Sequence, residues 1–165
     1  MSDIQEMYSF LLIDSPVGRI KLTSLNEKLV ALEFVSEEPK ERTAIKTSSC
    51  LEKTARELEK YFAGTGKTFT CDLDPMGTAF QKHAWKELQL IPYGQTISYS
   101  EQAEKVGGKQ YCRAVGQANK RNPLPIIIPC HRVIGKSGKL TGYASGLSRK
   151  QKLLELEAKY NFEVQ

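Results

Sequence analysis

The sequence is poor in the residues that build metal sites and disulfide frameworks. It has only two histidines, His83 and His131, and its four cysteines are widely separated, with no pair in Cys-x-x-Cys spacing. Because a local zinc site needs several such ligands close together in the sequence, we expect no bound metal. The spacing suggests no set of disulfides either, which favours a reducing intracellular compartment, either cytoplasm or nucleus.

Long apolar runs and cofactor motifs are also missing. No apolar run approaches the length of a membrane span, and the N-terminal residues lack the pattern of a signal peptide, so we expect no membrane association. Neither a G-x-G-x-x-G motif nor a P-loop is present, so we expect no nucleotide cofactor. Internal repeats and low-complexity segments are absent as well.

The composition is that of a folded globular protein. Of 165 residues, 40% are hydrophobic and 26% are charged, which is enough apolar material for the core of one domain or of two small ones. The 24 basic residues exceed the 19 acidic ones, giving a formal charge of +5. This excess fits a polyanionic partner such as nucleic acid, and it fits a merely basic soluble protein equally well.

The first part of the chain reads as strand-rich. Alternating apolar residues and turn signals predict three strands, at residues 8–13, 19–23 and 29–35. Helical spacing from Leu51 to Phe62 predicts a helix that Gly64 ends, and residues 68–73 read as one more short strand. We place a domain boundary at residues 74–77, which divides the chain into domains 1–75 and 76–165.

The second part reads as helix-rich. Thr78 can cap a helix that ends before Pro92-Tyr-Gly94, and Ser98 with Glu101 forms a capping box for a short helix that ends near Val106. Another helix is expected at 110–120. Two short helices joined by a glycine turn fit a helix-turn-helix motif, and they also fit a plain helical hairpin.

The helix expected at 110–120 has an unusual surface for a reader of the major groove. Ala114 and Gly116 are small, which allows the backbone to approach a narrow surface closely. Lys120 and Arg121 at its end can reach phosphates. Such a helix suits the minor groove of DNA.

Residues 122–134 contain the most informative stretch. Pro123, Pro125 and Pro129 exclude a helix there, so we expect a rigid, extended and largely buried segment. It ends in Cys130 and His131, which places a thiol beside an imidazole.

A thiol nucleophile needs a base, and the base needs an orienting acceptor. Glu157 can be that acceptor, because helical spacing places it on the apolar stripe of Leu153 and Leu154, where a carboxylate must be paired or protonated. A nearby cation would lower the pKa of the thiol. The alternatives are that Cys130 is a small buried apolar residue and that His131 is a hydrogen-bonded core histidine.

Pro129-Cys-His-Arg-Val-Ile134 resembles the active-site signature of the O6-alkylguanine-DNA alkyltransferases, also called methylated-DNA–protein-cysteine methyltransferases. The similarity covers about residues 77–158 and continues, in family order and spacing, at Phe80-Gln81, Trp85, Ile91-Pro-Tyr-Gly94, Ser98-Tyr99, Arg113-Ala-Val-Gly116, Asn122-Pro123, Gly142-Tyr143, Lys150, Leu153-Leu154 and Glu157. The resemblance implies a mixed α+β and α/β fold class. A small ribonuclease-H-like N-terminal α/β domain with a three-stranded meander would precede a mostly helical C-terminal domain with a helix-turn-helix.

The resemblance also implies a function. The chain would be a suicide enzyme of DNA repair that flips O6-alkylguanine out of duplex DNA and transfers the alkyl group irreversibly to Cys130. O4-alkylthymine is left open as a second substrate. The implied partner is double-stranded DNA contacted through its minor groove. We expect a monomer.

Site residues follow from the same resemblance. His131 would act through water as the base, oriented by Glu157, and Asn122 would brace the turn before the thiol. Tyr99 would help to rotate the lesion phosphate and would protonate the leaving base at N3. The implied DNA-binding and base-flipping residues are Tyr99, Arg113, Ala114, Gly116, Lys120 and Arg121, and the implied base pocket consists of Tyr143, Ala144, Ser145 and Gly146.

Two departures and two rival functions stay open at this point. Ala144-Ser145 stands where many relatives have Ser-Gly or Gly-Gly, so Ser145 narrows the pocket wall, and Tyr111 is bulkier than the usual residue at its position. One rival is a lesion-binding relative that transfers nothing, which lacks the cysteine. The other is a thiol hydrolase or redox protein, which would not need Arg113 or Tyr99.

Overall fold

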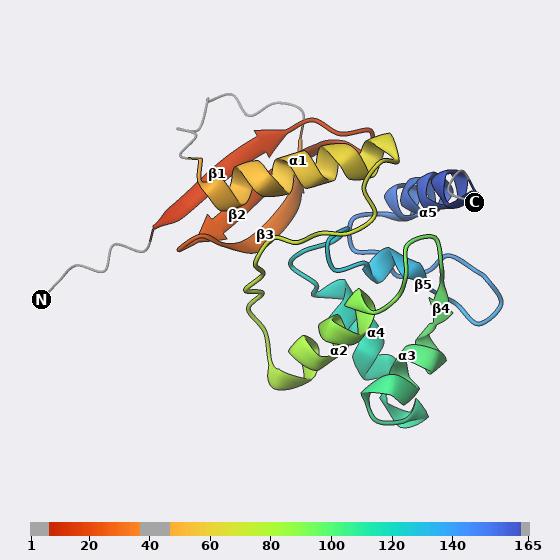
Figure 1. Cartoon of the computed structure of the whole chain (residues 1–165). Coiled ribbons are helices and arrows are strands. Elements are labelled where there is room, and N and C mark those ends of the chain that lie inside the picture. Colours follow the sequence, from red (N-terminus) through yellow and green to blue (C-terminus); the bar gives the residue numbers. More distant parts are fainter. Residues whose placement is uncertain (1–6, 37–46, 163–165) are drawn as a thin grey trace, which may run out of the picture. The chain divides into compact units, whose positions relative to one another are not determined.

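The computed structural model describes residues 7–36 and 47–162 (Figure 1). The chain divides into two compact units, Met1–Pro75 and Met76–Gln165. Within the described residues, no helix is both long enough and apolar enough to cross a membrane.

The first unit is a three-stranded antiparallel sheet covered on one face by a helix (Figure 1). Its strands are β1 (Tyr8–Ile13), β2 (Arg19–Leu25) and β3 (Lys28–Val35), in the order β1-β2-β3, where the alternation predicted them. Its helix is α1 (Ser49–Ala63), which begins at the Ser48 cap and ends at Gly64, as predicted. Leu22 pairs with Leu11 and Leu32 across the sheet, and this row helps to form the buried face against α1.

The short strand predicted at residues 68–73 is wrong. Only Leu73 pairs, through an isolated parallel bridge to Leu29 at the start of β3. The backbone N–H of Thr70 donates instead to the Glu57 carboxylate on α1 (3.0 Å), and Lys53 Nζ donates to the Thr70 carbonyl (3.3 Å). Side chains of α1 therefore satisfy the backbone of Thr70, and backbone bonding to β3 is confined to the end of the segment, where the Asp72 carbonyl accepts from the Leu29 N–H (2.8 Å).

The second unit is mostly helical, with one two-stranded parallel sheet in which Ile97 pairs with Val133 and Ser98 with Ile134. Its elements are α2 (Ala79–Gln89), β4 (Ile97–Ser98), α3 (Tyr99–Val106), the 3₁₀ turn η1 (Lys109–Tyr111), α4 (Cys112–Lys120), the 3₁₀ turn η2 (Cys130–Arg132), β5 (Val133–Ile134) and α5 (Leu147–Phe162). The capping box at Ser98 and Glu101 is confirmed.

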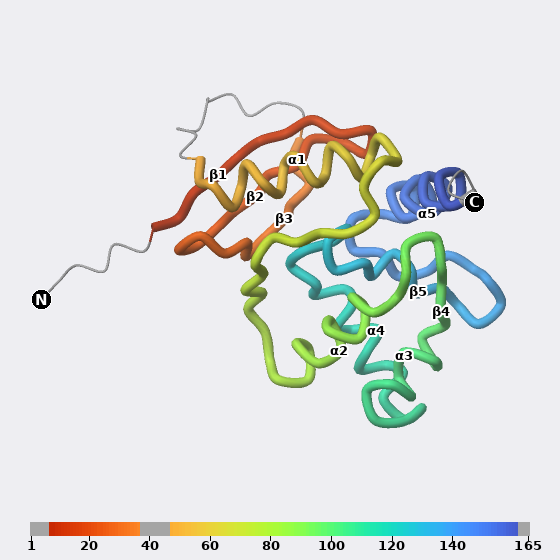
Figure 2. Tube along the Cα trace, viewed as in Figure 1, coloured from red at the N-terminus to blue at the C-terminus, as the bar shows by residue number. Residues whose placement is uncertain are grey.

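Residues 122–134 are largely buried, as predicted. The predicted extended conformation holds only for Val133–Ile134, which form β5, and is wrong for residues 122–132, where the chain turns (Figure 2). The chain turns repeatedly: Ile128 N–H donates to the Leu124 carbonyl (2.8 Å), and Ile126 has a positive φ of 75°. Cys130, His131 and Arg132 then form η2. Proline fixes only its own φ, near −65°, which suits turns as well as extended chain. In the absence of a neighbouring strand, local hydrogen bonds satisfy part of the buried backbone.

Helices α2 and α3 both hold α4 through polar contacts inside the core. The indole N–H of Trp85 on α2 donates to the Ala118 carbonyl (2.8 Å). The side-chain amides of Gln102 on α3 and Asn119 on α4 hydrogen-bond each other reciprocally, at 2.9 and 2.7 Å. Both amides are nearly inaccessible to solvent, at 0% and 5% exposure, so this pair fixes how the two helices of the predicted helix-turn-helix cross.

Breaking the amide pair tests its contribution. Asn119→Ala leaves the Gln102 amide buried without its partner, so we expect the free energy of unfolding of this unit to fall by about 1–3 kcal/mol. Trp85 is the only tryptophan of the chain, so its fluorescence in urea reports on this unit. The double variant Gln102→Leu/Asn119→Met removes both polar groups and should lose less stability than Asn119→Ala.

The control is Gln117→Ala, an exposed position on the same helix. Its effect should stay within about 0.5 kcal/mol. A loss in Asn119→Ala no larger than in this control would contradict a stabilising role for the pair.

Candidate active site

The turn η2 carries the thiol and the imidazole. Cys130 is 6% exposed and His131 is 0% exposed. Neighbouring side chains of an extended chain point in opposite directions, but here a local turn relates them: the Arg132 N–H donates to the Pro129 carbonyl (3.0 Å).

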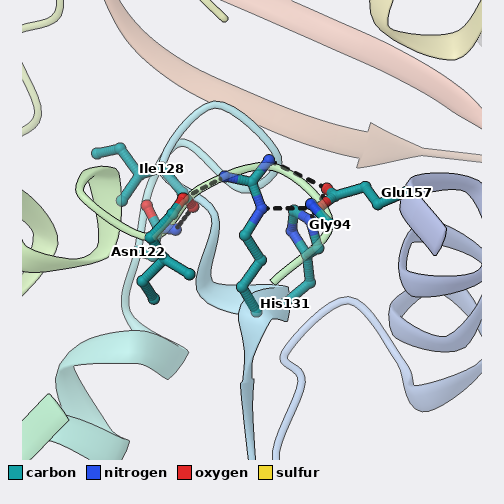
Figure 3. Close-up of polar contacts among 7 residues, drawn as sticks. Gly94, Asn122, Ile128, His131 and Glu157 are labelled. Atoms are coloured by element: carbon teal, nitrogen blue, oxygen red, sulfur yellow. Dashed lines mark hydrogen bonds and ion pairs between the residues drawn. The ribbon is translucent and has the colours of Figure 1, made fainter. Parts of the chain in front are cut away.

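The Glu157 carboxylate on α5 is the centre of the polar contacts around η2 (Figure 3). Its Oε2 lies 2.5 Å from His131 Nε2, and its Oε1 accepts from Arg132 Nε at 2.7 Å and from the Gly94 N–H at 3.1 Å. Arg132 Nη2 also donates to Oε2 (3.2 Å), which makes the pair bidentate. Arg132 Nη1 reaches the Ile91 carbonyl (2.7 Å).

These contacts determine the charge of both groups. Burial would raise the pKa of Glu157, but the hydrogen bonds from His131 and Arg132 and the positive charge of Arg132 lower it to about 2. Burial lowers the pKa of His131, and the charges of Arg132 and Lys150 lower it further, against the opposing effect of Glu157. Glu157 is therefore ionised and His131 neutral at neutral pH.

The neutral imidazole has one nitrogen that can accept a proton. Because Nε2 faces an ionised carboxylate, that nitrogen carries the proton and donates it. His131 Nδ1 is buried and has no hydrogen-bond partner among the described residues. Its lone pair is consequently available to accept a proton.

The Cys130 thiol is protonated at rest. Burial raises its pKa to about 11, although a hydrogen bond with Asn122 and the charge of Lys150 act in the opposite direction. The prediction that a nearby cation would lower this pKa is confirmed for Lys150, but desolvation of the thiolate outweighs the attraction of the cation, so the pKa is raised overall. The thiol needs a base before it can react near neutral pH.

Asn122 stabilises the turns that lead to the thiol. Its Nδ2 donates to the Ile128 carbonyl (2.7 Å), and its Oδ1 accepts from the Leu124 N–H (2.9 Å) (Figure 3). The side chain also reaches the thiol of Cys130. Asn122 thus bridges the segment after α4 to both the carbonyl before Pro129 and the sulfur.

Two tyrosines lie close enough to Cys130 for the charge of its thiolate to raise the pKa of each phenol, adding to the larger effect of burial. Tyr99 donates to the Thr141 carbonyl (3.0 Å). Tyr143 is 9% exposed, whereas Ala144 and Gly146 are exposed and Ser145 is half-buried. Of the four residues expected in the base pocket, only Tyr143 is buried and has a pKa that the charge of the Cys130 thiolate affects.

The outer face of α4 is accessible to solvent. Arg113, Lys120 and Arg121 are exposed, while Ala114 and Gly116 are half-buried. A Cβ built on Gly116 would meet no atom within 4 Å, so the glycine leaves room for a ligand rather than for packing inside the unit. At the end of α4, the side chain of Lys120 lies against Gly142.

Known protein families match nearly the whole chain. Family models described as the ribonuclease-like domain and the DNA binding domain of 6-O-methylguanine DNA methyltransferase match residues 8–75 and 79–159. The chain belongs to this family. The resemblance stated from the sequence and the fold class are therefore confirmed, including the ribonuclease-like N-terminal domain.

Relatives of this methyltransferase family member match over nearly their whole length. A methylated-DNA–protein-cysteine methyltransferase of Methanosarcina acetivorans is 46% identical over 151 residues, which is 90% of this chain and 97% of the relative. One from Mycolicibacterium paratuberculosis is 43% identical, over 94% and 95% of the two chains. Crystal structures of the Mycobacterium tuberculosis O6-methylguanine methyltransferase, without and with DNA, superpose with TM-scores of 0.82 and 0.81, at 44% and 45% identity. Coverage is 93% and 94% of the two chains in the first comparison, and 92% and 93% in the second.

The sequence motifs contain Arg132, Gly94 and Lys150, but the sequence alone does not predict what these three residues contact. Arg132 and the Gly94 N–H are partners of Glu157. Lys150 is 1% exposed and donates to the carbonyls of Val133 (2.6 Å) and Thr141 (2.9 Å). Lys150 could have been found, because it precedes Glu157 by seven residues and so extends the same buried stripe of α5.

Glu157→Gln tests the shared carboxylate. It leaves Arg132 as a buried cation without its anion, so we expect the free energy of unfolding at pH 7 to fall by about 3–5 kcal/mol, measured by Trp85 fluorescence in urea. The contribution of Glu157 is fully present above its ordinary pKa of 4.5 and is lost as pH falls toward the folded-state pKa of about 2. The difference in free energy of unfolding between the parent and Glu157→Gln should therefore become smaller as pH falls below 4.5.

Glu155→Gln is the matched control, because Glu155 is an exposed carboxylate on the same helix. Its stability should follow that of the parent at each pH. If Glu157→Gln lowers the free energy of unfolding by the same amount at pH 7 and at pH 3, Glu157 is not an ion-paired acid.

Proposed function

We propose that Cys130 is the residue that accepts the alkyl group in the reaction of this family member, which is DNA repair by alkyl transfer to a protein cysteine. The observation that carries this assignment is the buried array of Cys130, neutral His131 and ionised Glu157. It supplies a nucleophile, a base with one free nitrogen, and an acceptor that orients the base. The other cysteines, Cys50, Cys71 and Cys112, have no such neighbours among the contacts described.

The reaction follows from these charges. His131 Nδ1 takes the thiol proton through a water molecule, and the resulting thiolate attacks the alkyl carbon in line with its bond to O6. The S–C bond forms while the C–O6 bond breaks, and the electron pair of that bond leaves with guanine. Tyr99 protonates the departing base at N3. Glu157 stabilises the imidazolium that forms on His131.

The product explains why each molecule acts once. An S-alkyl cysteine is a thioether, which has no acyl carbon for water to attack and so does not hydrolyse. A thiol hydrolase would need such an acyl intermediate, and a lesion-binding relative that transfers nothing would lack the cysteine. The family and the presence of Cys130 therefore favour irreversible transfer over both rivals.

DNA is the partner, and the finer proposal is that α4 enters the minor groove and that the alkylated base is turned out of the duplex. The O6 atom is out of reach inside the stack, so extrusion is needed at a cost of a few kcal/mol. Ala114 and Gly116 allow close approach, Lys120 and Arg121 contact phosphates, and Arg113 enters the stack in place of the flipped base. The chain acts on this DNA as a monomer.

Mass spectrometry tests the acceptor. After incubation with a duplex that carries O6-methylguanine, the peptide containing Cys130 should gain the mass of one methyl group, in a yield of one per molecule. Cys130→Ser should gain none. Cys112→Ala is the control, because Cys112 is a half-buried thiol and the variant should still be methylated at Cys130. Methylation of a different residue in the parent chain would refute the assignment.

The role of Arg113 is tested by comparing two substrates. If Arg113 offsets about 1.4 kcal/mol of the cost of extrusion, Arg113→Ala should react about tenfold more slowly with duplex DNA. Reaction with free O6-benzylguanine, which needs no extrusion, should keep its rate. Lys152→Ala removes an exposed charge from α5 and controls for the loss of one positive charge. Equal losses on both substrates would contradict a role in base flipping.

A further inference from the structure

The segment from Thr141 to Gly146, which carries Tyr143, is held at its two ends by neighbouring basic residues of α5. Lys150 Nζ donates to the Thr141 carbonyl (2.9 Å), and Arg149 Nη1 donates to the Ser145 carbonyl (2.9 Å). Tyr99 adds a second donor to the Thr141 carbonyl (3.0 Å). We call residues 141–146 the pocket loop.

The pocket loop contains glycines that give its backbone conformational freedom. Gly142 and Gly146 have positive φ values of 66° and 100°, so the two positions most able to change conformation lie next to the two anchored carbonyls. Between them, a turn is closed by the Gly146 N–H donating to the Tyr143 carbonyl (3.0 Å). The anchors from outside the loop therefore set where this turn lies.

The two anchors differ in their surroundings. Lys150 is 1% exposed and also bonds the Val133 carbonyl beside η2, so it belongs to the interior that holds the thiol. Arg149 is half-buried and reaches out to the loop from the first turn of α5. Loss of the Arg149 contact would release the Ser145 carbonyl, while the Lys150 N–H still holds the Gly146 carbonyl (3.2 Å) and Lys150 Nζ still holds the Thr141 end.

Release of the Ser145 end would act on the alkyl site through Tyr143. The Tyr143 side chain is buried, which raises the pKa of its phenol, and the charges of the Cys130 thiolate and of Arg149 also act on that pKa. Its backbone carbonyl is part of the turn that ends at Gly146. A shift of Ser145 would therefore move Tyr143 relative to the sulfur and change the space for an alkyl group.

We propose that Arg149 is a positioning residue that fixes the outer wall of the alkyl pocket and limits the size of the group that Cys130 accepts. The inference rests on the proposed function of Cys130. Arg149 touches neither sulfur nor substrate in this role. It acts through the Ser145 carbonyl and the turn that carries Tyr143.

The test compares rate constants for Cys130 alkylation by two duplexes that differ only in the lesion, O6-methylguanine or O6-benzylguanine. In Arg149→Ala and Arg149→Gln, the methyl reaction should slow because the wall packs less closely, and the benzyl reaction should slow less or accelerate. The benzyl-to-methyl ratio should rise about tenfold, the lower end of what one methylene of pocket space contributes to discrimination. Lys152→Ala, on the exposed side of the same helix, should keep the parent ratio.

Hydrogen exchange gives a second readout that does not depend on turnover. Peptides that cover residues 142–146 should exchange faster in Arg149→Ala, while those from residues 150–160 should keep the parent protection. An unchanged ratio, an equal change in both rates, or unchanged exchange in the pocket loop would overturn the inference. Failure of the parent chain to transfer either group would instead overturn the proposed function, and the role of Arg149 in alkyl selection with it.

Discussion

The buried carboxylate of Glu157 is the constraint on which the rest of the second unit depends. An ionised carboxylate away from water must be fully paired, because its desolvation costs several kcal/mol. Glu157 lies on α5, and its partners come from two other segments: Gly94 after α2, and His131 with Arg132 on η2. Arg132 extends the network to the Ile91 carbonyl. The need to satisfy one anion therefore places the base beside the thiol and fixes both against α5.

The same anion explains why the site is unreactive at rest but ready to react. Arg132 carries a permanent charge, so Glu157 stays ionised without taking a proton from the imidazole, and His131 stays neutral. The thiol is protonated because burial raises its pKa to about 11. A buried thiol is a weak nucleophile toward stray electrophiles and oxidants. In the reaction proposed above, proton transfer to His131 then produces the thiolate, which suits a residue that can react once.

Much of the fold was predictable because its signals are local. Strand alternation, the Gly64 stop and the Ser98–Glu101 capping box each depend on residues a few positions apart, and Glu157 was found because a carboxylate is out of place on an apolar helical stripe. What failed depends on which partner each backbone group finds. The N–H and carbonyl of Thr70 bond to side chains of α1 rather than to a strand, and most of the proline-rich segment turns through local hydrogen bonds instead of extending. The bond from Arg132 to the carbonyl of Ile91, on a distant segment of the chain, leaves no periodic trace in the sequence.

The two sides of the alkyl site are built in different ways, and the chemistry accounts for the difference. On the thiol side, prolines, the Asn122 brace and the Glu157 network leave the sulfur little freedom, as an in-line displacement requires a well-fixed nucleophile. On the opposite side, the pocket loop has glycines at positive φ and is anchored through carbonyls by side chains of α3 and α5. The attacking atom is the same for every lesion, whereas the alkyl group varies in size. A rigid nucleophile facing a wall set by replaceable side chains allows alkyl selectivity to change, through residues such as Arg149 and Ser145, without disturbing the carboxylate that activates the base.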